Sequence, residues 1–149
     1  MKQYISRNHR LLENMVRQNS DESNREKRLL MVFPLDIAAH YLCCLELCKK
    51  LKDQFEISFA HSLKYDSFVR NCGFETFKVE NFNSEEVTAA ASNFDFSWLN
   101  LPNIELVLNS QINAIEEHKP DLVLGDAAFT LKMAAEKPAC PMSRFLTVT

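Results

Sequence analysis

The sequence predicts an α/β fold: a Rossmann-like, doubly wound parallel sheet in a single domain. Short apolar runs of strand length alternate with longer segments in which apolar residues recur at helical spacing. Several of the short runs are apolar almost throughout, as is typical of parallel strands that are buried on both faces. Strands and helices that alternate in this way form a parallel sheet with right-handed crossovers.

Five segments have the character of strands. The first, residues 28–33, is apolar after its arginine, and Pro34 then turns the chain. The third alternates apolar and polar residues, whereas the fourth is a short apolar run that ends on the carboxylate of Asp126. The predicted strands are 28–33, 56–60, 74–79, 121–126 and 143–149.

Five further segments are predicted to be helical. Lysines at the end of the first helix suit the negative end of its dipole, and Gly73 follows the second helix at a place that favours positive φ. Pro102 introduces the longest helix and Pro138 ends the last one. The predicted helices are 38–52, 64–71, 84–91, 104–118 and 129–137.

Residues 1–27 are predicted to be a polar N-terminal extension to a domain that spans residues 28–149. Apolar side chains are few in this extension and could form one face of a weakly amphipathic helix, which a solvated polar stretch follows. A linker or appendage is the preferred interpretation, and a docking helix is the alternative.

Composition excludes several classes of function. A chain of 149 residues with 46% hydrophobic and 25% charged residues is typical of a soluble globular domain. A net charge of −3 gives no electrostatic footprint for nucleic acid or for an anionic membrane. We expect neither a membrane span nor a signal peptide, and therefore a cytoplasmic protein.

Glycine and cysteine usage limits the ligands that the domain can hold. The loop after the first predicted strand, residues 34–39, contains no glycine, so neither a dinucleotide fingerprint nor a phosphate-binding P-loop can form there. Five cysteines form an odd count without the paired spacing of a disulfide framework or a zinc site. We therefore expect no metal and no cofactor bound by this domain.

The chemistry is predicted to lie at the carboxyl edge of the sheet. With the strand order 3-2-1-4-5, the first and fourth strands are neighbours, and ligands bind beyond their carboxyl ends. His40, Asp126 and Asp36 would meet there. A histidine that an aspartate orients can act as a general base on a hydroxyl group. In the alternative interpretation, a backbone carbonyl satisfies His40 and Asp126 caps the next helix.

Aromatic residues are concentrated in the irregular region before the longest helix. Phe82, Phe94, Phe96, Trp98 and Leu99 could wall an apolar acceptor pocket, because loops above this edge commonly shape such sites. The alternative is that they only pack beneath a loop. The residues expected to bind substrate are Asp36, Ala39, Phe94, Phe96, Trp98 and Phe129.

Five motifs then follow one another in a distinctive order. An apolar strand ends in Phe33-Pro34, Ala39-His40 opens a helix, and residues 45–51 read Leu-Glu-Leu-Cys-Lys-Lys-Leu. Residues 72–75, Cys-Gly-Phe-Glu, lead into the third strand, and residues 120–126 read Pro-Asp-Leu-Val-Leu-Gly-Asp. This order resembles the N-terminal, acceptor-side domain of GT-B glycosyltransferases, in particular the UDP-glycosyltransferase branch.

The resemblance extends over residues 28–149 and implies a mechanism. It implies that His40 is the general base for an acceptor hydroxyl and that Asp126 supports it. It also implies that the transfer inverts the configuration of the sugar's anomeric carbon and needs no metal. Ala39 departs from the glycine that is usual in the family, which would crowd the acceptor near His40. The implied donor is a UDP-sugar, bound by a C-terminal domain that we expect to be missing here.

The chain alone is therefore expected to be inactive as half of a glycosyltransferase. Its expected partners are a hydroxyl-bearing small-molecule acceptor and either a separate donor-binding domain or a second copy of itself. An alternative from another class is a Rossmann-like binding or interaction module without catalysis. A flavodoxin-like nucleotide binder is a third possibility, against which the glycine-poor first loop argues.

Overall fold

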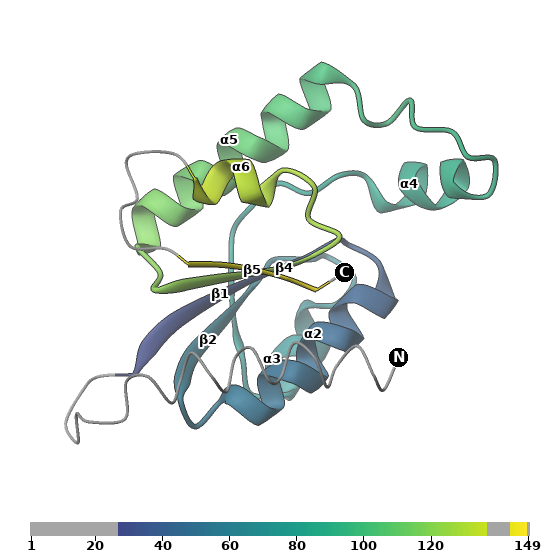
Figure 1. Ribbon diagram of the computed structural model, residues 1–149. Helices are drawn as coiled ribbons and strands as arrows, with labels where there is room; N and C mark the ends of the chain where they lie inside the picture. Colours follow the sequence, from purple (N-terminus) through teal and green to yellow (C-terminus); the bar gives the residue numbers. More distant parts are fainter. Residues whose placement is uncertain (1–26, 137–143, 149) are drawn as a thin grey trace.

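The fold is a five-stranded, fully parallel sheet with helices on both faces (Figure 1). The computed structural model describes residues 27–136 and 144–148, so residues 1–26 of the predicted N-terminal extension lie outside these ranges. The order β3-β2-β1-β4-β5 confirms the predicted fold class and strand order. The strands are β1 Arg28–Pro34, β2 Phe55–Ala60, β3 Glu75–Phe77, β4 Leu122–Asp126 and β5 Arg144–Val148.

The helices form two layers that enclose the sheet. The helices are α2 Ala38–Leu51, α3 Asp66–Asn71, α4 Ser84–Ala91, α5 Leu101–His118 and α6 Leu131–Ala135. Figure 1 shows α2 and α3 on one face of the sheet and α5 and α6 on the other, whereas α4 lies to one side. The fold is therefore a three-layer sandwich in which α4 and its flanking loops extend beyond the sheet.

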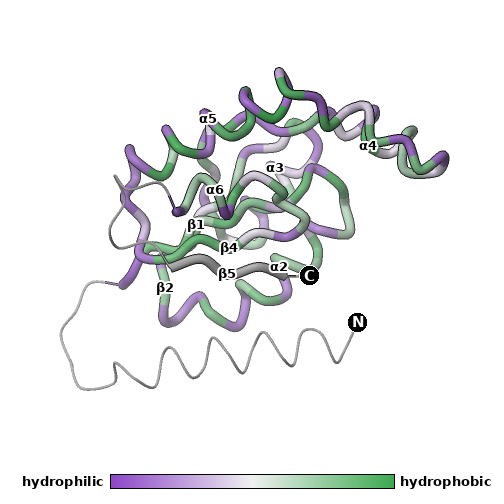
Figure 2. The backbone as a smooth tube through the Cα atoms, turned by 45° about the horizontal axis from the view of Figure 1, so that its top comes forward, coloured by the Kyte–Doolittle hydropathy of each residue, from purple (hydrophilic) through white to green (hydrophobic). Residues whose placement is uncertain are grey.

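The central strand divides its side chains between two cores. Leu30 and Val32 of β1 belong to the core beneath α2 and α3, and Met31 and Phe33 belong to the core beneath α5 and α6. All four side chains are at most 2% exposed. Burial on both faces explains why this strand is apolar after Arg28. Helix α5 instead alternates hydrophobic and hydrophilic residues along its length (Figure 2).

Most elements differ from their predicted bounds by one to three residues, among them β3, α5 and α6. The strand predicted over 74–79 shortens to β3 because its ladder pairs Ala60 with Phe77, and β2 ends at Ala60. Helix α5 begins earlier than predicted, because the Asn100 side chain accepts a hydrogen bond from the backbone N–H of Asn103 and caps the helix. The last helix was predicted over 129–137 and begins only at Leu131 within the described residues.

A glycine in β4 lets a loop pack directly on the sheet. A Cβ atom at Gly125 would lie 2.8 Å from Cδ2 of Leu131 and 3.1 Å from Cβ of Ala128. Neither approach leaves room for a methyl group. The absence of a side chain at this position therefore sets the height of α6 above the strand that ends in Asp126.

Candidate functional site

The candidate site lies where β1 and β4 end side by side. Pro34, the last residue of β1, is in register with Asp126, the last residue of β4. The backbone N–H of Leu35 then donates a hydrogen bond of 2.9 Å to the backbone oxygen of Asp126. This bond continues the ladder one residue into the loop, so that the chain leaving β1 stays beside Asp126.

His40 and Asp126 form a close pair at this edge. The loop after β1 starts α2 at Ile37, the N-cap residue, which places His40 in the first helical turn. Nδ1 of His40 lies 3.0 Å from Oδ1 of Asp126, and the two side chains are 28% and 11% exposed. A carboxylate only accepts hydrogen bonds, so in this contact Nδ1 is the atom that can donate.

The backbone after Asp126 turns sharply. Ala127 has a φ of 52°, a left-handed conformation that costs a non-glycine residue about 1–2 kcal/mol. The next helix has Thr130 as its N-cap residue, so Asp126 does not cap it as the alternative interpretation proposed.

Burial and the Asp126 carboxylate raise the pKa of the Cys43 thiol, which lies one helical turn beyond His40. This thiol is therefore a poor nucleophile.

A buried serine holds a third candidate residue, Asp36. Ser62 is 2% exposed and follows β2, and its hydroxyl donates a hydrogen bond of 2.5 Å to Oδ1 of Asp36. The same hydroxyl oxygen accepts the backbone N–H groups of Lys64 and Tyr65 at 3.1 and 3.2 Å. Ser62 therefore joins the loop after β1 to the loop after β2.

The loop after β2 also contains a second histidine–aspartate pair, which the sequence analysis missed. Nδ1 of His61 lies 2.5 Å from Oδ2 of Asp66, and Oδ1 of Asp66 accepts the backbone N–H of Ser62 at 2.8 Å. The available signal was that His61 directly follows a strand, at the same edge of the sheet as His40. Oδ1 of Asp66 thus holds Ser62, which in turn holds Asp36, while Oδ2 of Asp66 contacts His61.

Tyr41 is a neutral neighbour of these groups. Its hydroxyl donates a hydrogen bond of 2.8 Å to the backbone oxygen of Ala60. Burial, followed by the carboxylates of Asp36 and Asp66, raises the pKa of Tyr41 well above its usual range. This phenol is therefore a structural donor between α2 and β2 and cannot serve as a base.

A pocket of about 430 Å³ opens beside Asp36. Of the residues expected to bind substrate, Asp36 lines this pocket; Ala39 is exposed on α2 and does not line it. His40 and Asp126 are also absent from its lining, although Ile37, the N-cap residue of the helix that carries His40, is part of it. The lining residues are Asp36, Ile37, Lys64, Tyr65, Ser84, Glu85, Thr88 and Ala89.

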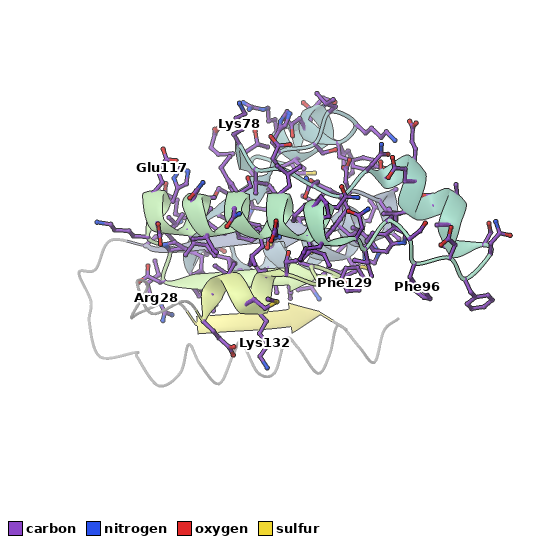
Figure 3. The ribbon with its side chains drawn as sticks, turned by 90° about the horizontal axis from the view of Figure 1, so that it is seen from above. Arg28, Lys78, Phe96, Glu117, Phe129 and Lys132 are labelled. Carbon is purple, nitrogen blue, oxygen red and sulfur yellow. The ribbon has the colours of Figure 1, made fainter. Side chains whose placement is uncertain are left out.

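The aromatic residues before α5 do not form a single wall. Trp98 is 8% exposed and packs between Phe82 and Phe129, with ring centroids 5.2 and 5.7 Å away. Phe94 and Phe96 are instead 85% and 65% exposed in the loop before α5, and Figure 3 shows Phe96 further from the sheet than Phe129. None of these five residues lines the pocket beside Asp36.

Two properties of the described residues bear on cofactors and membranes. Within 27–136 and 144–148, no three His, Cys, Asp or Glu side chains lie close enough together to hold a metal ion. Over the same part of the chain, no helix combines the length and apolar character that crossing a membrane requires.

Comparisons with known proteins connect this fold to glycosyltransferases. No family model and no curated protein matches the chain. A glycotransferase of kitacinnamycin matches with a TM-score of 0.61 and 20% identity, over 84% of this chain and 31% of that one. Spinosyn forosaminyltransferase SpnP matches with a TM-score of 0.57 and 18% identity, over 82% and 31%. SsfS6, a glycosyltransferase of Streptomyces sp. SF2575, matches with a TM-score of 0.57 and 16% identity, over 80% and 39%.

These matches define the class of fold. The chain has the Rossmann-like fold of one half of a GT-B glycosyltransferase. It spans 31–39% of the length of the structures that it matches. At identities of 15–20% the likeness concerns the fold, so the activity has to be argued from this chain's own residues.

Proposed function

We propose that this chain is the acceptor-binding half of an inverting, nucleotide-sugar-dependent glycosyltransferase in which His40 is the general base. The observation that carries the proposal is the 3.0 Å contact between Nδ1 of His40 and Oδ1 of Asp126 at the carboxyl edge of the sheet. This is the edge at which open parallel sheets bind their ligands. Among the described residues, Nε2 of His40 has no hydrogen-bond partner and is free to accept a proton.

The proposed step is a single displacement. Nε2 of His40 removes the proton from an acceptor hydroxyl while the hydroxyl oxygen forms a bond to the anomeric carbon of the sugar. The bond from that carbon to the nucleoside diphosphate breaks on the opposite face, so the configuration inverts and the diphosphate leaves with its electron pair. The Asp126 carboxylate holds the ring in the required tautomer and stabilises the imidazolium that forms.

The donor, proposed to be a UDP-sugar, would bind to a separate domain. The glycine-poor loop after β1 supports this assignment, because its backbone has no site for close approach to a diphosphate. The hydroxyl-bearing acceptor would bind to this half, and the chain alone would not turn over. We also propose a cytoplasmic location, supported by four cysteines that the structure describes as free thiols.

The test is to supply a donor-binding half. The chain is mixed with, or fused to, the unmatched remainder of the kitacinnamycin glycotransferase, and release of UDP from a UDP-sugar is measured with a panel of hydroxyl acceptors. His40→Ala should lower kcat by about 10²–10⁴-fold, the usual contribution of general base catalysis. His118→Ala, which removes an exposed histidine at the end of α5, is the control and should retain activity.

Asp126→Asn provides a second, more specific variant. An asparagine amide can donate to Nδ1 and thereby move the ring proton to Nε2, which removes the base without removing the ring. A loss about as large as that of His40→Ala is expected. Full activity of either variant would eliminate the proposed base.

A second candidate function is a binding module without catalysis. The observation that favours it is the lining of the pocket beside Asp36, which includes neither His40 nor Asp126. Such a module would bind a small molecule in this pocket, and binding would be insensitive to His40→Ala. It would also give no UDP release with any acceptor once a competent donor half is supplied.

A further inference from the structure

The pocket beside Asp36 is built from three elements with different charges. Asp36 comes from the loop after β1, Lys64 and Tyr65 come from the loop after β2, and Glu85 comes from α4. Its lining therefore contains two carboxylates and one ammonium group, and the remaining lining residues are uncharged. The pocket has an excess of one negative charge.

The ammonium group in the lining is already matched. Nζ of Lys64 donates to Oγ of Ser84 at 3.1 Å and lies 3.4 Å from Oε1 of Glu85. The Lys64 and Glu85 side chains are 46% and 83% exposed, so the pair is also screened by solvent. An anionic ligand would have to displace Glu85 from Lys64, so this lysine is a poor anion site.

The Asp36 carboxylate, unlike the Lys64 ammonium group, has no partner of opposite charge among the described residues. Its Oδ1 accepts the Ser62 hydroxyl, but among the described residues no cation pairs with its carboxylate and no group donates to Oδ2. Ser62 is 2% exposed and is fixed by three further hydrogen bonds, because its hydroxyl oxygen accepts two backbone N–H groups and its own N–H donates to the Asp66 side chain. The carboxylate is therefore held in place by a rigid neighbour while one oxygen remains available in a cavity.

Tyr65, an aromatic residue, also lines this pocket. Its ring packs against that of Tyr41, with centroids 4.9 Å apart, which restricts its movement. A carboxylate and an aromatic ring in one cavity are the groups that recognise an ammonium ion, through a charge-assisted hydrogen bond and a cation–π contact.

We propose that this pocket selects acceptors that carry a primary ammonium group, with Asp36 as the specificity-determining residue and Ser62 as its positioning residue. That the bound molecule is a glycosyl acceptor rests on the proposed function, whereas the preference for an ammonium group is a property of this chain alone. A neutral analogue binds more weakly, and an anionic analogue is rejected by the excess negative charge.

Three small phenols of nearly equal size test this selectivity. Tyramine, tyrosol and 4-hydroxyphenylacetate share a ring and a hydroxyl group and end in an ammonium, an alcohol and a carboxylate. Each is titrated at millimolar concentration into the ¹⁵N-labelled chain, and amide shifts of Thr88 and Ala89, which line the pocket, report binding. We expect tyramine to bind about tenfold more tightly than tyrosol, and 4-hydroxyphenylacetate to be the weakest of the three.

Variants assign the preference to Asp36 and Ser62. Asp36→Asn should weaken tyramine binding about tenfold and leave tyrosol within about twofold. Asp53→Asn, which removes an exposed charge between α2 and β2, is the matched control and should keep the full preference. Ser62→Ala should reduce the ratio of tyramine to tyrosol affinity, whereas Ser62→Thr, which keeps the hydroxyl, should restore it.

The outcomes separate this inference from the proposed function. Equal binding of the three phenols, a preference for the anion, no response at the pocket, or a preference that survives Asp36→Asn would each overturn the inference. None of these results would affect the His40 assay with a donor half. Conversely, a tyramine preference that depends on Asp36 would stand even if His40→Ala left transfer unchanged.

Discussion

Gly125→Ala is the substitution whose effect follows most directly from the packing around the site. The added Cβ would lie 2.8 Å from Cδ2 of Leu131 and 3.1 Å from Cβ of Ala128. Leu131 is 0% exposed, so the side chain that meets the new Cβ atom lies in the packed interior. The Leu131 side chain, the end of β4 or the start of α6 must therefore shift.

The magnitude is the difference between two effects. Overpacking of a buried site costs about 1–3 kcal/mol. Replacing glycine with alanine restricts the unfolded chain and returns about 0.4–1 kcal/mol. The net loss of unfolding free energy is therefore about 1–2 kcal/mol, which in a domain of this size corresponds to a fall in Tm of about 3–8 °C.

Urea denaturation and thermal unfolding of Gly125→Ala measure this loss. Leu131→Ala removes the clashing atom, so the double variant should be destabilised by at least about 1 kcal/mol less than the sum of the two single variants. Gly73→Ala is a useful comparison, because nothing lies within 4 Å of its Cβ position and its cost arises from a φ of +85°. Its cost should not depend on Leu131. A Gly125→Ala chain as stable as the parent would refute the close-packing argument.

Three further predictions concern stability. Thr130→Val should cost about 1–3 kcal/mol in urea denaturation, because Oε1 of buried Gln111 loses the hydroxyl that donates to it at 2.7 Å, whereas Thr130→Ser should cost much less. Lys119→Gly should be about 1 kcal/mol more stable than Lys119→Ala, since residue 119 ends α5 with a φ of 48°, and equal stability would contradict this. Burial raises the pKa values of Cys44 and Cys48, so only the unfolded chain forms these thiolates near pH 9. The unfolding free energy should therefore fall as the pH rises above about 8.5, by up to about 1.4 kcal/mol per pH unit for each thiol, and Cys48→Ala should flatten this slope.

The strands of the sheet could be predicted from the sequence because their hydrophobic patterns are strong and local. The strand that contains Met31 is buried on both faces, so its run of apolar residues has few other interpretations. Once the order of the strands was assumed, the carboxyl ends of β1 and β4 had to be neighbours. That step alone indicated that His40 and Asp126 lie near each other, 86 positions apart in the chain.

The loops could not be predicted in the same way. Asp66 holds Ser62, and Ser62 holds Asp36, through hydrogen bonds whose partners depend on loop conformation and have no periodic pattern in the sequence. The aromatic run before α5 shows the same limit. Tertiary packing buries Trp98 and leaves Phe94 exposed, although both belong to one short aromatic segment.

The most direct test of the proposed base is the tautomer of the His40 ring in the isolated chain. Long-range ¹H–¹⁵N NMR spectra of the neutral ring distinguish a proton on Nδ1 from a proton on Nε2. The 3.0 Å contact with Asp126 predicts the proton on Nδ1, and Asp126→Asn should move it to Nε2. A proton on Nε2 in the parent chain, or a tautomer that Asp126→Asn leaves unchanged, would contradict the assignment of His40 as a base that Asp126 orients.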